Sequence, residues 1–369
     1  MKRKRVILSV IGVLVALPLL AACAAPAPAP PAPAPPAPAP APPAPAPPAP
    51  APVEVIKWRF AATASRGMIH FEQVDKLTAE ELIAMSDGRL DVTIYGVGEI
   101  IEADELFAAC KAGTVDMSTS WGYHVGEVPF DEVFYQLPMG LRNASEAAVL
   151  LYERGAYELA KEVYLAHNVH FLPPQTPTGI YPIYHSGVPI RSLDDIKGFK
   201  IRSYGAFAST HEKLGATVVW IPFAELYTAV ATGVIDGFSN PTLGESVDMK
   251  FYEVCRYAIM PAFCNYLMAS QFVNMDSWNG LTADLQAIIH AAAIHASLRH
   301  DHVYLNLDQS ARPIMEAAGV EFIELPPEDY AQIGEIAREV WDECAAKDPT
   351  GYATQFIEIY KDYMEELGR

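Results

Sequence analysis

The chain has 369 residues, of which 51% are hydrophobic, and its 45 acidic residues outnumber its 26 basic ones, which gives a formal net charge of −19 at pH 7. Phosphate binding needs clusters of Lys and Arg, and such clusters are absent from the acidic main part of the sequence. The composition therefore excludes a nucleic-acid-binding protein. The five cysteines lack the paired spacing of a zinc site.

The first 22 residues have the pattern of an export signal. Four basic residues within Met1–Arg5 precede an apolar run over Val6–Ala22, which ends in small residues and is too short for a dependable membrane-spanning helix. Removing these four charges changes the net charge to −19 − 4 = −23. The segment therefore predicts a signal peptide over 1–22 and an exported protein.

The residues around Cys23 resemble a bacterial lipobox, Leu-Ala-Ala-Cys. This resemblance implies lipidation of Cys23 and anchoring to the outer side of the cytoplasmic membrane, in the periplasm or on the cell surface. A stray cysteine after a signal peptide is the alternative. Ala24–Pro52 is almost pure Ala and Pro, so 23–52 is predicted to be a lipidated linker in polyproline II conformation, at most about 90 Å long. A passive linker of no particular length is the other interpretation.

Alternating strands and helices begin after this linker. Ile56–Ala61 and Leu90–Tyr95 read as strands around a helix over Ile69–Met85. Arg66 lies in the loop after the first strand, at a helix start, where an anion would be favoured. We therefore expect Arg66 either to contact an anionic ligand or to be an exposed loop residue.

The middle of the chain predicts two crossings between lobes. A long helix over Ser145–Leu165, with Ser145 as its cap, is followed by strands Val169–Leu172 and Gly179–His185, separated by two prolines. The boundaries predicted from this pattern are lobe I at 53–174 with 265–325, lobe II at 175–264 and C-terminal helices at 326–369. Two crossings form a hinge, whose closure on a ligand is a common switching motion.

The segment Gly198–Pro241 has the order strand, helix, strand, helix, strand, which is typical of a mostly parallel sheet. Ligands of such sheets bind beyond the carboxyl ends of the strands, and Arg202 and Asn240 both lie at strand ends. A surface or inter-element salt bridge is the alternative role for Arg202. Thr282–Gly319 is predicted to be one long helix, on which four histidines, at 290, 295, 300 and 302, are spaced so that they rotate around the axis and do not form a metal cluster.

The same segment carries an ordered set of residues: Gly198, Lys200, Arg202, Pro222, Glu225, Tyr227, Ala229, Gly233, Asp236, Gly237, Asn240 and Pro241. This set resembles the signature of the substrate-binding P subunits of TRAP transporters, and the similarity extends over Lys57–Leu367. The resemblance implies an α/β, two-lobed periplasmic-binding-protein-like fold with two mixed sheets flanked by helices, a hinge, and a long helix spanning both lobes. It also implies an extracytoplasmic receptor for an organic acid, which it delivers to small and large membrane subunits.

In that family an arginine pairs with the substrate carboxylate, which implies this role for Arg202, and an asparagine amide that bonds the carboxylate implies a similar role for Asn240. The predicted substrate-binding residues are Arg202, Asn240, Trp121, Tyr123, Tyr181, Tyr204, Phe223, Phe238 and Arg66. TakP-type members hold a cation, but the corresponding positions here are Tyr181, Ser239 and Asn240. We therefore expect a monocarboxylate or bulky organic acid, bound without metal or other cofactor.

Other readings stay open at this point. The acidic pairs Asp194-Asp195 and Glu80-Glu81 could suggest an enzyme on the same framework, but no activated Ser, Cys or metal site accompanies them, so we expect no enzyme. A receptor for a signalling or ABC-type partner is a further alternative.

The C-terminal tail resembles a subgroup that forms homodimers. Cys110 and Cys255 lie in apolar runs and are predicted to be buried thiols, whereas Cys264 and Cys344 give no indication of their disulfide state.

Overall fold

The computed structural model describes residues 54–369, and the predictions for the signal peptide, Cys23 and the linker lie outside this range. A first sheet has the strand order β2-β1-β3-β10-β4. β1 pairs in parallel with β2 and β3, whereas β10 is antiparallel to β3 and β4, so the sheet is mixed. Its strands are β1 Ile56–Ala61, β2 Leu90–Tyr95, β3 Met117–Ser120, β4 Val169–Gln175 and β10 Ala269–Asn274.

A second sheet of six strands has the order β11-β9-β5-β8-β6-β7. β6 is parallel to β7 and β8, and Arg202 at the end of β6 is level with Val219 and Phe238 on those neighbours. The carboxyl ends of three strands therefore meet at one edge, as predicted. The strands are β5 Thr178–Ser186, β6 Lys200–Arg202, β7 Thr217–Val219, β8 Gly237–Phe238, β9 Tyr257–Tyr266 and β11 Glu321–Glu324.

The chain passes between the two sheets in residues 176–177, between β4 and β5, and returns in 267–268, between β9 and β10. The predicted break at Pro173-Pro174 is wrong, because β4 runs through both prolines. β4 is an edge strand, where a residue without an N–H is tolerated. Residues 321–324 were predicted in lobe I, but β11 pairs with β9 of the second sheet, to which the preceding long helix carries the chain.

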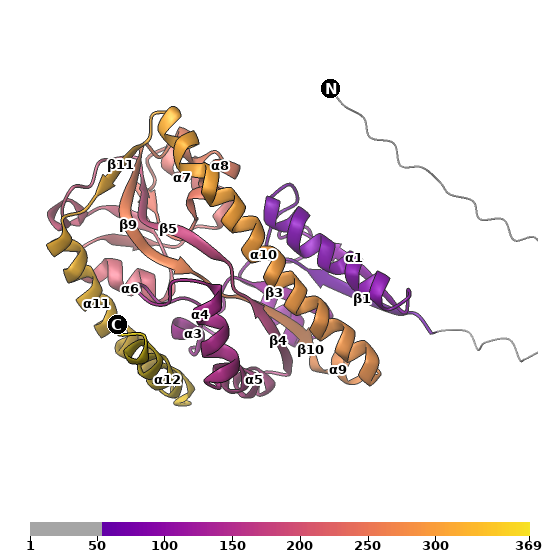
Figure 1. Ribbon diagram of the computed structural model, residues 1–369. Helices are drawn as coiled ribbons and strands as arrows, with labels where there is room; N and C mark the ends of the chain where they lie inside the picture. Colours follow the sequence, from indigo (N-terminus) through magenta and orange to yellow (C-terminus); the bar gives the residue numbers. More distant parts are fainter. Residues whose placement is uncertain (1–53) are drawn as a thin grey trace, which may run out of the picture. The chain divides into compact units, whose positions relative to one another are not determined.

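The long helix α10, Ala283–Ala317, confirms the predicted helix and contacts β4 of the first sheet and β5 of the second (Figure 1). The other α-helices are α1 Lys76–Met85, α2 Leu106–Lys111, α3 Asp131–Phe134, α4 Ala144–Ala148, α5 Ala156–Leu165, α6 Gly205–Lys213, α7 Leu226–Ala231, α8 Leu243–Asp248, α9 Met275–Asn279, α11 Pro327–Ala345 and α12 Tyr352–Glu366. Short π-helical segments at 71–75 and 149–153 adjoin α1 and α4, and 3-10 turns lie at 193–196, 223–225 and 251–253.

The helix predicted over 145–165 is broken into parts. Gly155 has φ +84°, a left-handed conformation that ends one helical segment before α5 starts. The cap is Asn143 and not Ser145, because the Asn143 side chain accepts a hydrogen bond from the Glu146 N–H. The predicted helices at the C-terminus are confirmed, and α12 buries Phe356 and Tyr360 in the core of the first lobe.

The four cysteines among the described residues are free and buried, which confirms the prediction for Cys110 and Cys255. No helix within 54–369 is long and apolar enough to cross a membrane.

Asp308 of α10 joins the long helix to the second lobe. Its carboxylate accepts hydrogen bonds from the backbone N–H groups of Ile180 and Gly244, and the residue is buried. We expect Asp308→Ala to lower the free energy of unfolding by about 3 kcal/mol, because both donors would lose their acceptor. Glu316→Ala, which removes an exposed carboxylate of the same helix, should cost less than about 1 kcal/mol in the same urea titration. Equal losses for the two variants would contradict this role.

Candidate functional site

Arg202 is a fully buried cation at the carboxyl edge of the second sheet. Its Nε donates to the Ile221 carbonyl at 3.0 Å. The guanidinium carbon lies 4.9 Å from the ring centre of Tyr204 and 4.8 Å from that of Trp220, so both rings hold it by cation–π contact. Its Nη2 has no hydrogen-bond partner among the described residues. A buried charge is costly unless it is paired, so this group is arranged to receive an anion.

Among residues 54–369, Glu245 is the one carboxylate that lines the same cavity. It occupies the third position of α8, where Thr242 and Glu245 form a capping box that fixes the side chain. Its Oε2 accepts from the Thr242 N–H at 2.8 Å, and its Oε1 accepts from the Tyr304 hydroxyl at 2.7 Å. Burial raises the pKa of Glu245 to about 7, so the group titrates near neutral pH.

The cavity lies between the two lobes and receives side chains from both of them. Its free volume of about 20 Å³ corresponds to roughly one water molecule. An organic acid therefore needs the walls to move apart before it enters. The lining residues are Trp121, Tyr123, Tyr135, Arg202, Tyr204, Phe223, Asn240, Glu245, Leu267, His300 and Tyr304.

Asn240 has φ +90°, a left-handed conformation that is uncommon outside glycine and asparagine. Its Nδ2 donates to Gln136 Oε1 at 2.6 Å, and its Oδ1 accepts from Ser239 Oγ at 3.0 Å. Gln136 follows α3 in the first lobe, so this hydrogen bond joins the two lobes at the cavity. The side-chain amide predicted to bind a carboxylate is engaged within the protein in this structure.

Six of the nine predicted substrate-binding residues line the cavity: Arg202, Asn240, Trp121, Tyr123, Tyr204 and Phe223. The structure does not place the other three on its wall. Tyr181 is buried, and its hydroxyl has no partner among the described residues. Phe238 packs against the rings of His185 and Phe251, with centroids 5.3 and 4.9 Å away.

Arg66 lies outside the cavity, as an exposed loop residue. Its guanidinium pairs with Glu99 and lies over the ring of Phe71. The side chain is 53% exposed. This placement agrees with the second of the two expectations for Arg66, an exposed loop residue.

Several lining residues were missed by the sequence reasoning, including Glu245, His300 and Tyr304. The pattern Thr-x-x-Glu at 242–245 is a helix-start signal that could have drawn attention to Glu245. His300 was considered only as a metal ligand. Among residues 54–369 no group of three or more His, Cys, Asp or Glu is arranged to hold a metal ion.

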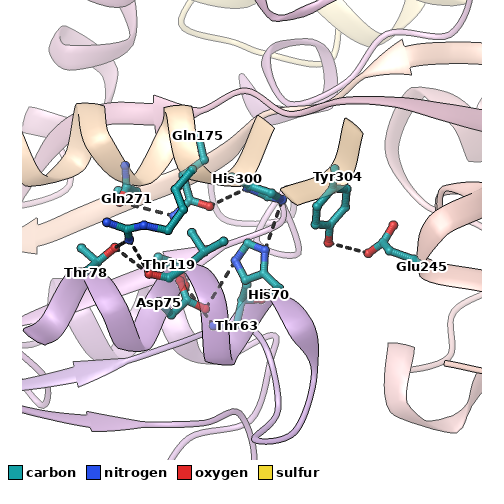
Figure 2. A network of polar contacts seen from close by, with 12 residues as sticks. Thr63, His70, Asp75, Thr78, Thr119, Gln175, Glu245, Gln271, His300 and Tyr304 are labelled. Carbon is teal, nitrogen blue, oxygen red and sulfur yellow. Dashed lines mark hydrogen bonds and ion pairs between the residues drawn. The ribbon is translucent and has the colours of Figure 1, made fainter. Parts of the chain in front are cut away.

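A buried chain of polar contacts leads from the cavity into the first lobe (Figure 2). His300 Nδ1 lies 2.7 Å from Gln175 Oε1, and its Nε2 lies 3.2 Å from Nδ1 of His70. His70 Nε2 is in turn 3.4 Å from Asp75. Burial lowers the pKa of His300 well below its ordinary value, so this ring is neutral at pH 7. The chain fixes His300 and His70 at the boundary between α10 and the first lobe.

The comparisons with known proteins agree on one family. A monocarboxylate 2-oxoacid-binding periplasmic protein of Nostoc is 26% identical over 322 residues, which cover 85% of each chain. The C4-dicarboxylate-binding periplasmic protein of Rhodobacter capsulatus is 26% identical over 273 residues, 71% of this chain and 78% of that protein. A TRAP periplasmic solute-binding protein of Colwellia psychrerythraea, solved with bound calcium and pyruvate, has a TM-score of 0.79 at 25% identity, covering 85% of this chain and 95% of that one.

The fold is the two-lobed fold of TRAP solute-binding proteins, and residues 60–348 match the description "bacterial extracellular solute-binding protein, family 7". The chain therefore belongs to the family 7 bacterial extracellular solute-binding proteins.

Proposed function

We propose that this chain is the extracytoplasmic receptor of a TRAP transporter, and that it binds an organic acid between its lobes and delivers it to the membrane subunits. The observation that carries this proposal is the fully buried Arg202, whose Nη2 has no partner among residues 54–369 and lies in a cavity between the lobes. A guanidinium offers two parallel donors to one carboxylate, and these charge-assisted bonds strengthen when water is excluded. Binding, and not catalysis, is the chemistry that this arrangement supports.

The ligand class that we propose is a monocarboxylate. Within the described part of the chain, the cavity wall carries one arginine and one carboxylate, Glu245, which would repel a second carboxylate of the ligand whenever Glu245 is ionised. The relative from Nostoc binds monocarboxylate 2-oxoacids, and the solved relative from Colwellia holds pyruvate. The rings of Trp121, Tyr123, Tyr204 and Phe223 provide apolar walls for the remainder of the acid.

We further propose that binding needs no metal ion, although the Colwellia protein was solved with calcium. The positions that hold the cation in TakP-type receptors are Tyr181, Ser239 and Asn240 here. A phenol, a hydroxyl and an amide supply no carboxylate, and the hydroxyl of Ser239 and the amide of Asn240 already bond to each other. These residues fit a cation poorly.

The signal peptide, the lipid anchor, the linker and the oligomeric state stay predictions. We propose a signal peptide at 1–22, lipidation of Cys23, and a linker up to residue 52 that holds the receptor near the membrane while leaving it free to move. Intact-mass measurement of the exported protein would reveal the acyl chains on Cys23. A homodimer through the C-terminal helices is a separate prediction, which sedimentation equilibrium checks.

Replacing Arg202 tests the carboxylate clamp. Arg202→Ala should weaken binding of pyruvate, or of the best acid found in a thermal-shift panel, by at least about a hundredfold, because the ligand charge would be buried without a partner. Arg202→Lys should fail almost as badly, since an ammonium cannot form the two parallel bonds. Titration calorimetry gives both affinities.

Arg66→Ala is the matched control, because it also removes an arginine after a strand of the α/β framework, and it should leave the affinity unchanged. A loss of less than about tenfold in Arg202→Ala would contradict the clamp. Retention of the unfolding midpoint in urea shows that any loss is not due to misfolding.

Glu245 predicts a pH dependence of binding. Its pKa of about 7 means that it is neutral below and negative above this pH, so affinity for a monocarboxylate should fall as pH rises from about 6 to about 8, by roughly tenfold. Glu245→Gln should remove the dependence, whereas Glu225→Gln, which neutralises an exposed carboxylate, should keep it. Calorimetry at several pH values provides the measurement. Rising affinity with pH would instead indicate a ligand with a positive group beside Glu245.

Chelation tests the absence of a metal. Affinity for the acid should be the same within a factor of about two with and without EDTA, and in sodium-free and sodium-containing buffers, because the clamp is an organic cation. Loss of binding on chelation or on removal of sodium would show that a cation takes part. The Nostoc relative's substrate class, the 2-oxoacids, should be included in the panel together with simple aliphatic acids.

A further inference from the structure

A second and larger cavity, of about 460 Å³, lies apart from the ligand cavity. It is open to solvent on one side and is lined by the segment after α3, the end of β9, the helix α11 and the C-terminal part of the chain from α12. No residue lines both cavities. Its size is that of typical small-molecule sites. Its lining residues include Arg142, Cys264, Arg338, Trp341, Lys361 and Arg369.

The charged residues on this wall are all cations: Arg142, Arg338, Lys361 and Arg369. This is unexpected in a chain with 45 acidic and 26 basic residues. Lys361 pairs with Asp342, and Arg369 Nη2 pairs with Glu146 at 2.7 Å. Arg369 Nη1 is buried without a hydrogen-bond partner among the described residues.

The guanidinium groups of Arg142 and Arg338 have no ion pair or hydrogen bond within residues 54–369. Arg142 and Arg338 are exposed residues, so two solvent-exposed cations and one unsatisfied buried donor, Arg369 Nη1, line one cavity in the described part of the chain. A bound anion would accept hydrogen bonds from these donors and neutralise part of their charge.

Apart from Asn265, most of the rest of the wall is apolar. Trp341 Nε1 donates to the Pro138 carbonyl at 3.1 Å, and the Tyr330 hydroxyl donates to the Ala262 carbonyl at 2.7 Å. The polar atoms of these two rings are thus engaged, and their apolar surfaces remain for a ligand, together with Met139 and Met364. An apolar cavity with a few convergent cations suits a molecule with a hydrophobic body and a negative group.

We propose that this cavity is a second binding site, for an amphiphilic organic anion such as an aromatic carboxylate. The proposal does not rest on the acid-binding function of the interlobe cavity. The two sites are separated by a short path, because Gln136 donates to Cys264 Sγ on this wall at 3.1 Å and accepts from Asn240 at the interlobe cavity at 2.6 Å.

Naphthalene-1-acetate and its neutral amide are the probes, since they share a ring and differ in charge. The protein is purified in its exported form, and titration calorimetry measures the affinities of the acid and of the amide. We expect the acid to bind in the Arg202→Gln variant, which disables the interlobe clamp. In that background, Arg142→Gln with Arg338→Gln should weaken binding by about tenfold or more. The amide should bind the unaltered cavity more weakly than the acid.

The control pair is Arg191→Gln with Arg312→Gln, which removes two positive charges from exposed salt bridges elsewhere and should leave binding unchanged. Equal binding of acid and amide, equal losses in the two double variants, or loss of all binding with Arg202→Gln alone would overturn the proposal. So would a stable dimer that excludes the probe and that the Arg142 and Arg338 substitutions dissociate, because the cavity would then be covered by a second copy. Failure of the interlobe receptor function would appear separately, as the absence of binding of pyruvate and the other acids of the panel to the unaltered protein, whereas pyruvate binding that is unchanged in Arg202→Gln would contradict only the clamp.

Discussion

The burial of the Arg202 guanidinium without a counter-charge is the constraint on which the site depends. Removing a cation from water is expensive, and here the cost is offset only in part, by the Ile221 carbonyl and by the faces of Tyr204 and Trp220. The parallel pairing of β6 with β7 and β8 fixes the residues that supply these contacts. The sheet therefore holds a positive charge in an environment that a ligand anion completes.

The second wall of the cavity adds selectivity. Glu245 is held by its own helix cap and by Tyr304, and burial raises its pKa to about 7. Near physiological pH this carboxyl group is present in both protonation states. The ionised form accepts a hydrogen bond from a donor on the ligand, and the protonated form lets an anion come close without repulsion. The hydrogen bond between Asn240 and Gln136 then closes the cavity from the other side, by joining one lobe to the other.

Local sequence patterns predicted the elements that depend on neighbours in the chain. The end of β6 at Arg202, the end of β8 two residues before Asn240, the long helix and the C-terminal helices were predicted because their periodicity and their Gly and Pro signals are local. Gly155 could have indicated the break in the helix predicted over 145–165, but apolar spacing on both sides hid it.

Contacts between distant segments could not be predicted in this way. Arg66 is neutralised by Glu99, which is 33 positions away. Along α10, His300 contacts Gln175, 125 positions earlier, and Tyr304 contacts Glu245, 59 positions earlier. The sheet to which β11 belongs is likewise decided by β9, with which it pairs only after the long helix has crossed between lobes. Such long-range contacts cannot be predicted from the local patterns of a single sequence, because they depend on tertiary packing.

The helix α10 has a mechanical consequence for this architecture. Its 35 residues form a rod of about 52 Å that contacts strands of both sheets. Asp308 fastens the rod to the backbone of the second lobe. In the first lobe, Gln271 Nε2 donates to the Ala293 carbonyl at 3.2 Å, and Leu285 and Ile289 of the same helix lie in the core of the first sheet. The rod is therefore attached to both lobes, and any turn of one lobe against the other must be taken up along its length.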